Sequence, residues 1–268
     1  MPPHTLCSCP VLKKVGLFIY PSLLSQDTQL QLLNSLFHRD LSNPEHKTNV
    51  HMHYDVPYPQ SQNDDTAYSS YFHRSAKDLT FEPQDRAIHK AFKTDRYLQK
   101  KLRWITLGGQ YDWTSKVYHS EQPPDFPSDI KRLVEDHFAM KAEAAIVNLY
   151  SPGDTLALHR DVSEECDQPL VSISLGCDGI FVVGLDDVDG EMYVEAIRLR
   201  SGDAVLMSGR SRYAWHGVPK VVEGTCPSWM EDWPGVEGSD EYAKWKGWMR
   251  GKRINLNVRQ MFESVGDP

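Results

Sequence analysis

The amino-acid sequence predicts an α+β fold in which N-terminal helices precede a double-stranded β-helix, or jelly roll. Two patterns favour this fold class. Apolar residues near the N-terminus recur at helical spacing, whereas from residue 142 onward the period becomes that of β-strands. Gly and Asp separate the expected strands as turn residues. Seven or eight short strands divided in this way are typical of two sheets that pack as a roll.

The bulk composition indicates one large soluble domain. The chain has 268 residues, of which 40% are hydrophobic and 25% charged, enough for a sizeable core. Its net charge of -8 argues against general nucleic-acid binding, so any such contact needs a local basic face. Five Cys without paired spacing indicate free thiols in a reducing compartment. We expect an intracellular protein, nuclear, cytoplasmic or mitochondrial, with no segment near the ~18 apolar residues of a membrane span.

The first elements are a strand and a helix. Leu17-Phe18-Ile19-Tyr20 is an apolar run that Pro21 ends, which predicts a strand. Ser25 or Asp27 can cap the helix that follows. Its apolar stripe consists of Leu30, Leu33, Leu36 and Phe37, at spacings of three and four residues.

The rest of the N-terminal part is polar or basic. Residues 41–79 show no sustained period and predict a long loop or a mobile lid. Residues 85–103 predict a helix whose seven basic residues we interpret as a solvated face. We therefore expect 1–103 to pack as a strand, helices and a polar loop on a jelly-roll domain formed by 104–268.

The chain enters the jelly roll through an aromatic segment. Trp104 to Trp113 places aromatic residues beside glycines, which suits either core packing or a platform for a flat ligand. A Pro-rich loop at 123–127 leads to Ser128, a candidate cap for a helix. We expect Ile130, Leu133, Val134 and Phe138 to face inward from it. The strands predicted next are 144–150, 155–159, 170–175, 180–185, 192–199, 204–207 and 254–261.

A metal site is predicted at one of three H-x-D motifs. His38-Arg39-Asp40 falls where the first helix frays, which predicts a surface position, and His53-Tyr54-Asp55 lies in the polar loop. His159 and Asp161 instead end a strand, where residues two apart project to the same side. His216, after the strand 204–207, is the candidate third ligand. Two imidazoles and one carboxylate form the facial triad of non-haem Fe(II) oxygenases. The alternative for His216 is a core histidine bonded to the backbone.

The C-terminal strand alternates polar and apolar residues. Arg253, Asn255, Asn257 and Arg259 share one face of the segment Arg253-Ile254-Asn255-Leu256-Asn257-Val258-Arg259. Two arginines that face a barrel interior need anionic partners, and a dicarboxylate co-substrate supplies two. The alternative is an edge strand with its arginines in water.

These motifs together resemble one family. N-x-Y at 148–150, H-x-D at 159–161, a G-D-A-V strand at 202–205, S-R-x-x-x-H-G at 211–217 and R-x-N-x-x-x-R at 253–259 occur in order. The combination, over residues 102–262, resembles the AlkB family of Fe(II)/2-oxoglutarate dioxygenases. It is most similar to the eukaryotic branch of the first AlkB homologue. That placement depends on Leu102-Arg103-Trp104, the aromatics at 111–118, Pro127-Ser128-Asp129 and the long insert at 218–252.

The resemblance implies a role for each matching residue. His159, Asp161 and His216 would bind Fe(II) and act in catalysis, with 2-oxoglutarate and O2 as co-substrates. Residues around 2-oxoglutarate would be Asn148, Tyr150, Arg253, Asn255 and Arg259, with Arg253 at the distal carboxylate and Arg259 near the end that chelates iron. Residues 104–125 would form a nucleotide-recognition lid that carries Trp113 and Tyr118, and the His159 ring would help to sandwich the target base. Ser163 stands where bacterial AlkB has an acid that contacts the base, so base choice does not carry over.

The implied reaction is oxidative demethylation of a nucleobase, which releases succinate, CO2 and formaldehyde. N1-methyladenine in tRNA or other RNA is the leading substrate, and N-methyladenine in DNA follows. The run 244–252 interleaves Lys246, Arg250 and Lys252 with tryptophans, which suits either RNA binding or an amphipathic helix packed on the core. The alternatives are a dioxygenase that acts on histones or other proteins, and a nucleic-acid-binding protein without turnover. No pattern indicates the oligomeric state.

Overall fold

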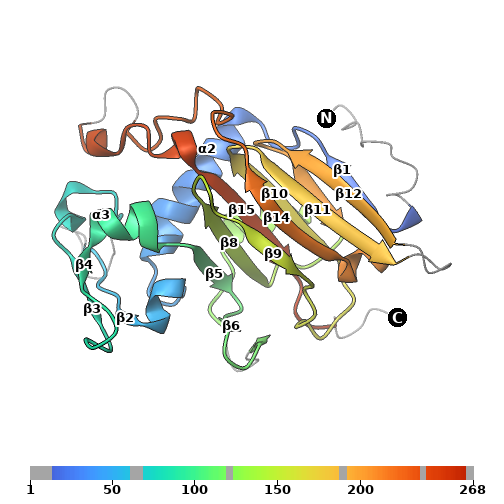
Figure 1. Cartoon of the computed structure of the whole chain (residues 1–268), viewed down its shortest axis with the longest axis horizontal. Coiled ribbons are helices and arrows are strands. Elements are labelled where there is room, and N and C mark those ends of the chain that lie inside the picture. The colour runs from blue at the N-terminus through green and yellow to red at the C-terminus, as the bar shows by residue number, and fades with distance from the viewer. Residues whose placement is uncertain (1–13, 61–68, 119–122, 187–191, 236–239, 264–268) are drawn as a thin grey trace.

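Two antiparallel sheets face each other and form the predicted jelly roll (Figure 1). The computed structural model describes residues 14–60, 69–118, 123–186, 192–235 and 240–263. The six-stranded sheet has the order β1 (Leu17–Tyr20), β13 (Ala204–Met207), β10 (Leu170–Gly176), β15 (Arg253–Arg259), β8 (Ala144–Tyr150) and β5 (Trp104–Gly108). The four-stranded sheet has the order β12 (Met192–Leu199), β11 (Gly179–Asp186), β14 (Trp215–Val221) and β9 (Leu156–His159).

The predicted strands are confirmed to within two residues, but two strands of the roll, β5 and β14, were missed. The segment of β5 was assigned to the lid, and β14 was not recognised as a strand. Its sequence contains Gly217 and Pro219, which weaken the pattern of a strand. The ladder tolerates them because the register between β11 and β14 shifts between Ile180 and Val182. Tertiary pairing on both edges therefore forms a strand that local propensity opposes.

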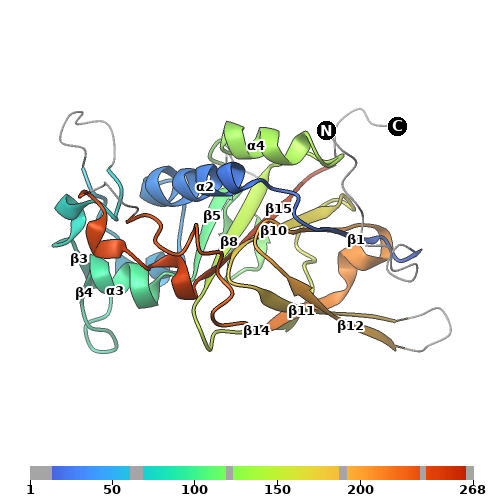
Figure 2. The ribbon, with the colours of Figure 1, turned by 90° about the horizontal axis from the view of Figure 1, so that it is seen from above.

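Helices cover the outer face of the six-stranded sheet. α2 (Gln26–Asn34) begins at Ser25, whose hydroxyl accepts a hydrogen bond from the Thr28 amide, and continues as a π-helical turn through Arg39. The predicted stripe points into the core, where Leu33, Leu36 and Phe37 are fully buried. Figure 2 shows α2 and α4 (Ser128–Glu135) together on one side of this sheet, with β11, β12 and β14 on the other. The cap of α4 is Pro127, so the expectation that Ser128 caps this helix was wrong.

The long helix expected at 85–103 is wrong. Only α3 (Thr94–Arg96) and the π-helical turn Tyr97–Lys101 are helical there, after β4 (Phe92–Lys93). The pattern misled because aromatic residues of this segment pack in an irregular cluster: Tyr97 is fully buried against Phe81 and Tyr71.

Residues 41–79 are not a lid over the roll, as far as the structure describes them. They form short 3-10 turns and β2 (Tyr54–Asp55), which pairs with β3 (Thr80–Pro83) in a small sheet beside the roll. Tyr71 and Phe72 are buried there. Residues 61–68 lie outside the described residues. Aromatic burial holds this segment although it has no regular period.

The insert at 218–252 packs against this N-terminal part. After β14 it forms 3-10 turns at Ala243–Trp245 and Met249–Gly251. The indole N–H of Trp245 donates to the Phe72 carbonyl at 2.8 Å, and Met249 is fully buried. Trp245 and Trp248 are buried, as the packing interpretation predicted, but they pack on Phe72 of the N-terminal part and not on the jelly roll. The segment is also a pair of turns and not an amphipathic helix. None of the helices in the described ranges has the length and apolar character to cross a membrane.

Candidate active site

A cavity of about 400 Å³ lies between the two sheets. Both sheets and the hairpin after β5 contribute to its lining. The lining includes most of the predicted site residues: His159, Asp161 and His216, then Asn148, Arg253, Asn255 and Arg259, then Trp113 and Ser163. One cavity therefore joins the three expected metal ligands to four of the expected co-substrate residues and to two of the expected substrate residues.

The three candidate metal ligands converge at one end of the four-stranded sheet. β9 and β14 are antiparallel neighbours, and His159 lies directly opposite His216 in their register. Nε2 of His159 lies 3.7 Å from Asp161 Oδ1, and Nε2 of His216 lies 3.9 Å from Asp161 Oδ2. One ligand atom from each residue lies within 4.8 Å of the others, a spacing that fits a single metal ion. The other two H-x-D motifs do not form such a group in the described part of the chain.

Backbone carbonyls orient both imidazoles. Nδ1 of His159 lies 3.0 Å from the Ala157 carbonyl, and Nδ1 of His216 lies 3.0 Å from the Ala214 carbonyl. A carbonyl only accepts, so each Nδ1 carries the proton and each Nε2 keeps its lone pair. The backbone bond that competed with a metal role for His216 therefore supports that role, because it presents Nε2 to the metal.

The charge states of the ligands also suit a metal. Burial by itself would raise the pKa of the Asp161 carboxyl, but Arg259 and the two histidines outweigh it, and the pKa is lowered. Burial lowers the pKa of His216, although Asp161 opposes this shift. At neutral pH the site therefore holds an ionised carboxylate and a neutral imidazole, the forms that bind metal.

Buried donors without partners mark the distal end of the cavity. Arg253 is 1% exposed, and its Nη2 donates to the Ser174 hydroxyl at 3.0 Å. Among the described residues, its Nε and Nη1 and the hydroxyl of Tyr150 have no hydrogen-bond partner, although Tyr150 is not part of the cavity lining. Tyr150 lies opposite Arg253 in the β8–β15 register. Buried donors left unpaired are costly, so this end fits the distal carboxylate of 2-oxoglutarate.

Glycine at position 179 makes room for Arg253. A Cβ atom at Gly179 would lie 2.5 Å from Nε and 2.6 Å from Cζ of Arg253. We expect Gly179→Ala to push the guanidinium out of place and raise the KM for 2-oxoglutarate at least about tenfold, measured by succinate formation. Gly184→Ala in the same strand is the control, since its nearest neighbours are 3.9 Å away. An unchanged KM in Gly179→Ala would remove this role from Gly179.

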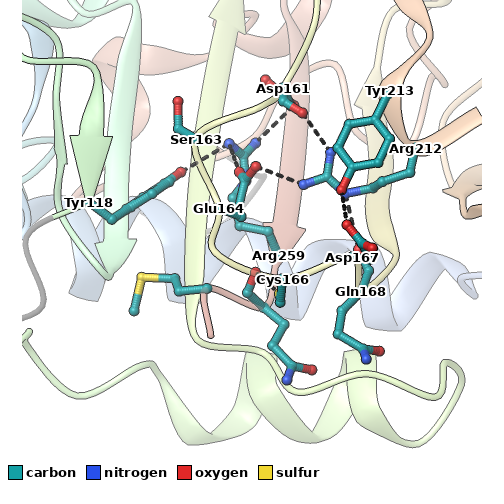
Figure 3. A network of polar contacts seen from close by, with 12 residues as sticks. Tyr118, Asp161, Ser163, Glu164, Cys166, Asp167, Gln168, Arg212, Tyr213 and Arg259 are labelled. Atoms are coloured by element: carbon teal, nitrogen blue, oxygen red, sulfur yellow. Dashed lines mark hydrogen bonds and ion pairs between the residues drawn. The ribbon is translucent and has the colours of Figure 1, made fainter. Parts of the chain in front are cut away.

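A network of charged groups surrounds the metal end of the cavity (Figure 3). Arg259 Nη2 lies 3.4 Å from Asp161 Oδ2, and Nη1 lies 3.2 Å from Glu164 Oε1. Glu164 also accepts from Arg212 at 2.7 Å, and Arg212 donates to the Asp161 carbonyl at 2.8 Å. Glu164 and Arg212 therefore support the loop that carries the metal ligand Asp161. This role was not predicted from the sequence for either residue. Their only signal was an acid beside Ser163 and the arginine of the S-R-x-x-x-H-G motif.

The predicted substrate residues do not all lie at the cavity: Trp113 and Ser163 line it, and Tyr118 does not. Trp113 is 39% exposed at the cavity and packs against Trp104, and Ser163 lies 3.4 Å from the Tyr111 hydroxyl. Tyr118 is buried and bonded to Arg259, so it does not present itself to a base. The lid range of 104–125 was too wide, because Trp104–Gly108 is β5 of the sheet and residues 119–122 lie outside the described residues.

The basic residues of the insert lie outside the cavity lining. Lys246 pairs with Asp232 at 3.6 Å, and Arg250 pairs with Glu231 at 3.3 Å. Lys252 is partly buried, and its ammonium donates to the Ser151 hydroxyl at 2.7 Å. The cations that do line the cavity are Lys116 and Arg160, which were not predicted, together with Arg253 and Arg259.

The first H-x-D motif is not the surface feature that was predicted. Asp40 is buried and bonds to Arg39, and His38 packs against Phe72, Trp233 and Tyr242. Burial lowers the pKa of His38 to about 4. It is a packed, neutral histidine.

Comparisons with known proteins agree with this geometry. A family model of the 2OG-Fe(II) oxygenase superfamily matches residues 16–259. The N6-methyladenosine RNA demethylase ALKB1 of Pyricularia oryzae is 48% identical over 92% of this chain and 75% of its own length. The tRNA demethylase abh1 of Schizosaccharomyces pombe is 39% identical over 93% of this chain and 80% of its own length. The solved structure of OsALKBH1 superposes with a TM-score of 0.59 at 20% identity, covering 96% of this chain and all of that one, and shows the shared fold.

The ligand set, the unpaired donors at the co-substrate end and these similarities point to one kind of enzyme. The chain belongs to the 2OG-Fe(II) oxygenase superfamily and, within it, to the AlkB family of Fe(II)- and 2-oxoglutarate-dependent dioxygenases.

Proposed function

We propose that this dioxygenase removes N-linked methyl groups from adenine in RNA, with N1-methyladenine in tRNA as its first substrate. The observation that supports this most is the make-up of the cavity. Its lining joins the metal ligands to exposed aromatic Trp113 and to the cations Lys116 and Arg160. Aromatic faces stack on bases and cations contact phosphates, so this lining suits a nucleotide better than a peptide.

Each part of the cavity has a separate task in this reaction. When bound, Fe(II) with 2-oxoglutarate and O2 supplies the oxidising power that attacks a methyl group. His159, Asp161 and His216 hold the metal, and Arg253 with Tyr150 anchors the distal carboxylate of 2-oxoglutarate. A base inside a stack cannot reach this depth, so the target nucleotide must be flipped out or lie in an unpaired loop. The products are succinate, CO2 and formaldehyde.

Two relatives favour N6-methyladenine as a second candidate. The proteins from Pyricularia oryzae and Cryphonectria parasitica, the latter 50% identical to this chain, are both named N6-methyladenosine RNA demethylases. A relative from Arabidopsis thaliana is named a DNA N(6)-methyladenine demethylase. Both candidates place a methylated adenine edge near the metal, so the substrate test has to compare them directly.

Nucleoside mass spectrometry on methylated tRNA, incubated with the protein, Fe(II) and 2-oxoglutarate, tests this proposal. We expect N1-methyladenosine to fall with the wild-type protein and to remain with His216→Ala. Loss of N6-methyladenosine alone would favour the second candidate. If succinate forms while all modified nucleosides persist, the RNA proposal fails, and methylated single-stranded DNA and methylated histone peptides become the next substrates to assay.

We expect two cations of the cavity lining, Lys116 and Arg160, to contact the RNA backbone. Neither Lys116 nor Arg160 has a carboxylate partner among the described residues, and Arg160 lies 5.3 Å from the ring of Trp215. We expect Lys116→Ala with Arg160→Ala to weaken tRNA binding and to lower the salt slope of log Kd by about 1 to 1.5. Fluorescence anisotropy over a range of salt concentrations measures both.

Substitution of the insert cations is the matched comparison. Lys246→Ala with Arg250→Ala removes the same charge, but both cations already face carboxylates. We expect a smaller loss of affinity than at the cavity. A larger loss would instead place the RNA-binding face on the insert.

A further inference from the structure

The hairpin beside the cavity carries two tyrosines, one that lines the cavity and one that points into the protein interior. It consists of β6 (Tyr111–Asp112) and β7 (Val117–Tyr118), with Tyr111 paired to Tyr118. Tyr111 and Trp113 line the cavity. Tyr118 points inward, is 7% exposed and packs with Ala144 and Met261. One hairpin therefore contacts both the substrate side of the cavity and the protein interior.

The interior contact of Tyr118 is made with the co-substrate arginine. Its hydroxyl accepts a hydrogen bond from Arg259 Nη1 at 2.9 Å (Figure 3). Burial raises the pKa of Tyr118 to about 12, so the hydroxyl stays neutral beside the guanidinium. A hydrogen bond to a charged group in a buried place is stronger than one between neutral groups.

Arg259 divides its donors among three groups. Nη1 serves Tyr118 and Glu164, and Nη2 faces the metal ligand Asp161. Nε is buried and has no partner among the described residues. The orientation of the guanidinium, at a cavity that Arg259 lines, therefore depends on the contacts at the other two nitrogens. A carboxylate bound at this end would hold the same guanidinium from the opposite side.

Few other contacts secure the hairpin. Each of its strands has two residues, and the Tyr111 hydroxyl lies at a long 3.4 Å from Ser163. Trp113 packs on Trp104 with ring centroids 4.9 Å apart, while remaining 39% exposed. The bond from Arg259 to Tyr118 is thus a buried, charged hydrogen bond that joins this hairpin to the jelly roll.

We propose that Tyr118 is a positioning residue that couples the co-substrate site to the substrate hairpin. Through Arg259, bound 2-oxoglutarate holds the hairpin in the position that shapes the cavity for a base. Tyr118 in turn keeps Arg259 oriented for the co-substrate. The inference depends on the 2-oxoglutarate site and not on which nucleobase is demethylated.

Hydrogen–deuterium exchange on the full chain tests this coupling without any nucleic acid. The protein is loaded with Mn(II), which prevents turnover, and exchange of the peptide covering 109–118 is followed with and without 2-oxoglutarate. We expect 2-oxoglutarate to slow exchange of this peptide in the wild type. In Tyr118→Phe, which keeps the packed ring, the slowing should be lost. In Tyr71→Phe, which removes a buried phenol hydroxyl that donates to the Pro57 carbonyl outside the cavity lining, it should remain.

Calorimetry on the same proteins supplies the second readout. We expect Tyr118→Phe to raise the Kd for 2-oxoglutarate about 3- to 10-fold in the Mn(II) protein, and Tyr71→Phe, outside the cavity lining, to leave it unchanged. The coupling is refuted if 2-oxoglutarate does not change the exchange rate of peptide 109–118 in the wild type. It is also refuted if Tyr118→Phe has the same exchange rates and the same Kd for 2-oxoglutarate as the wild type. Neither measurement depends on the substrate, so a failed tRNA assay would leave this test intact.

Discussion

His216→Ala should abolish succinate formation and weaken metal binding more than about 100-fold, because it removes one of the three ligands. His216 and His159 face each other across the β9–β14 ladder, and both Nε2 atoms approach Asp161. His159 and Asp161 alone cannot form the three-ligand facial arrangement that holds the metal. Binding of Mn(II), followed by electron paramagnetic resonance, and formaldehyde release from methylated tRNA measure the two effects separately.

His53→Ala is the matched control for that variant. It makes the same substitution in an H-x-D motif of the small sheet, where the structure shows no cluster of metal ligands among the described residues. We expect full metal binding and full turnover. If His216→Ala kept tight Mn(II) binding, or if His53→Ala lost it, the assignment of the metal site would be wrong.

Arg253→Met should remove 2-oxoglutarate binding without destabilising the protein in the absence of ligands. Breaking one partner of a buried ion pair costs about 3–5 kcal/mol, which corresponds to a rise in the KM for 2-oxoglutarate of at least 100-fold. In the protein without co-substrate, however, the guanidinium is buried with two nitrogens unpaired. Burial lowers the pKa of Arg253, a sign that the charged form is poorly solvated. A methionine of similar length avoids that cost.

Thermal unfolding separates these two effects. We expect the Tm of Arg253→Met without ligand to equal or exceed that of the wild type. The rise in Tm that Mn(II) with 2-oxoglutarate gives the wild type should disappear. Arg86→Met is the control, since Arg86 is exposed and its guanidinium pairs with Glu82 on the surface, at 3.4 Å. A large fall in Tm with a retained 2-oxoglutarate response would show that Arg253 is structural.

The arginines of the co-substrate strand were predictable because their geometry is local: residues two apart on a strand share a face, which places Arg253 with Asn255 and Arg259. The alternation of the strand showed which side chains face the interior. Several strand ranges were predictable for the same reason, since a period of two reports one buried face. His159 and Asp161 are close in sequence, but β9 ends at His159, and His216 joins them only through the β9–β14 pairing. The third ligand was therefore predicted from the order of motifs that resembles the AlkB family.

Other parts of the molecule depend on residues far apart in the chain. Tyr118 carries no sign in its own segment that it bonds to Arg259, 141 residues away, instead of facing a base. Lys246 and Arg250 are basic in sequence, yet they face acids of the same insert. The expected helix at 85–103 gave way to a short strand and a π-helical turn because its aromatic residues pack on Tyr71 and Phe81. These contacts form only when distant segments meet.

The sequence by itself indicated the strands of the jelly roll and the polar residues that share a face of each strand, because alternation along a strand sets which side chains point the same way. The metal ligands and the arginines of the co-substrate site were singled out by the order of motifs that resembles the AlkB family. Only the tertiary structure decided how those groups are held. It placed Gly179 beneath Arg253, joined Glu164 to Arg212 and Arg259, and turned Tyr118 inward. The reason is that a buried charge is stable only where its partners converge on it, and those partners come from strands and loops with no local relation in the sequence.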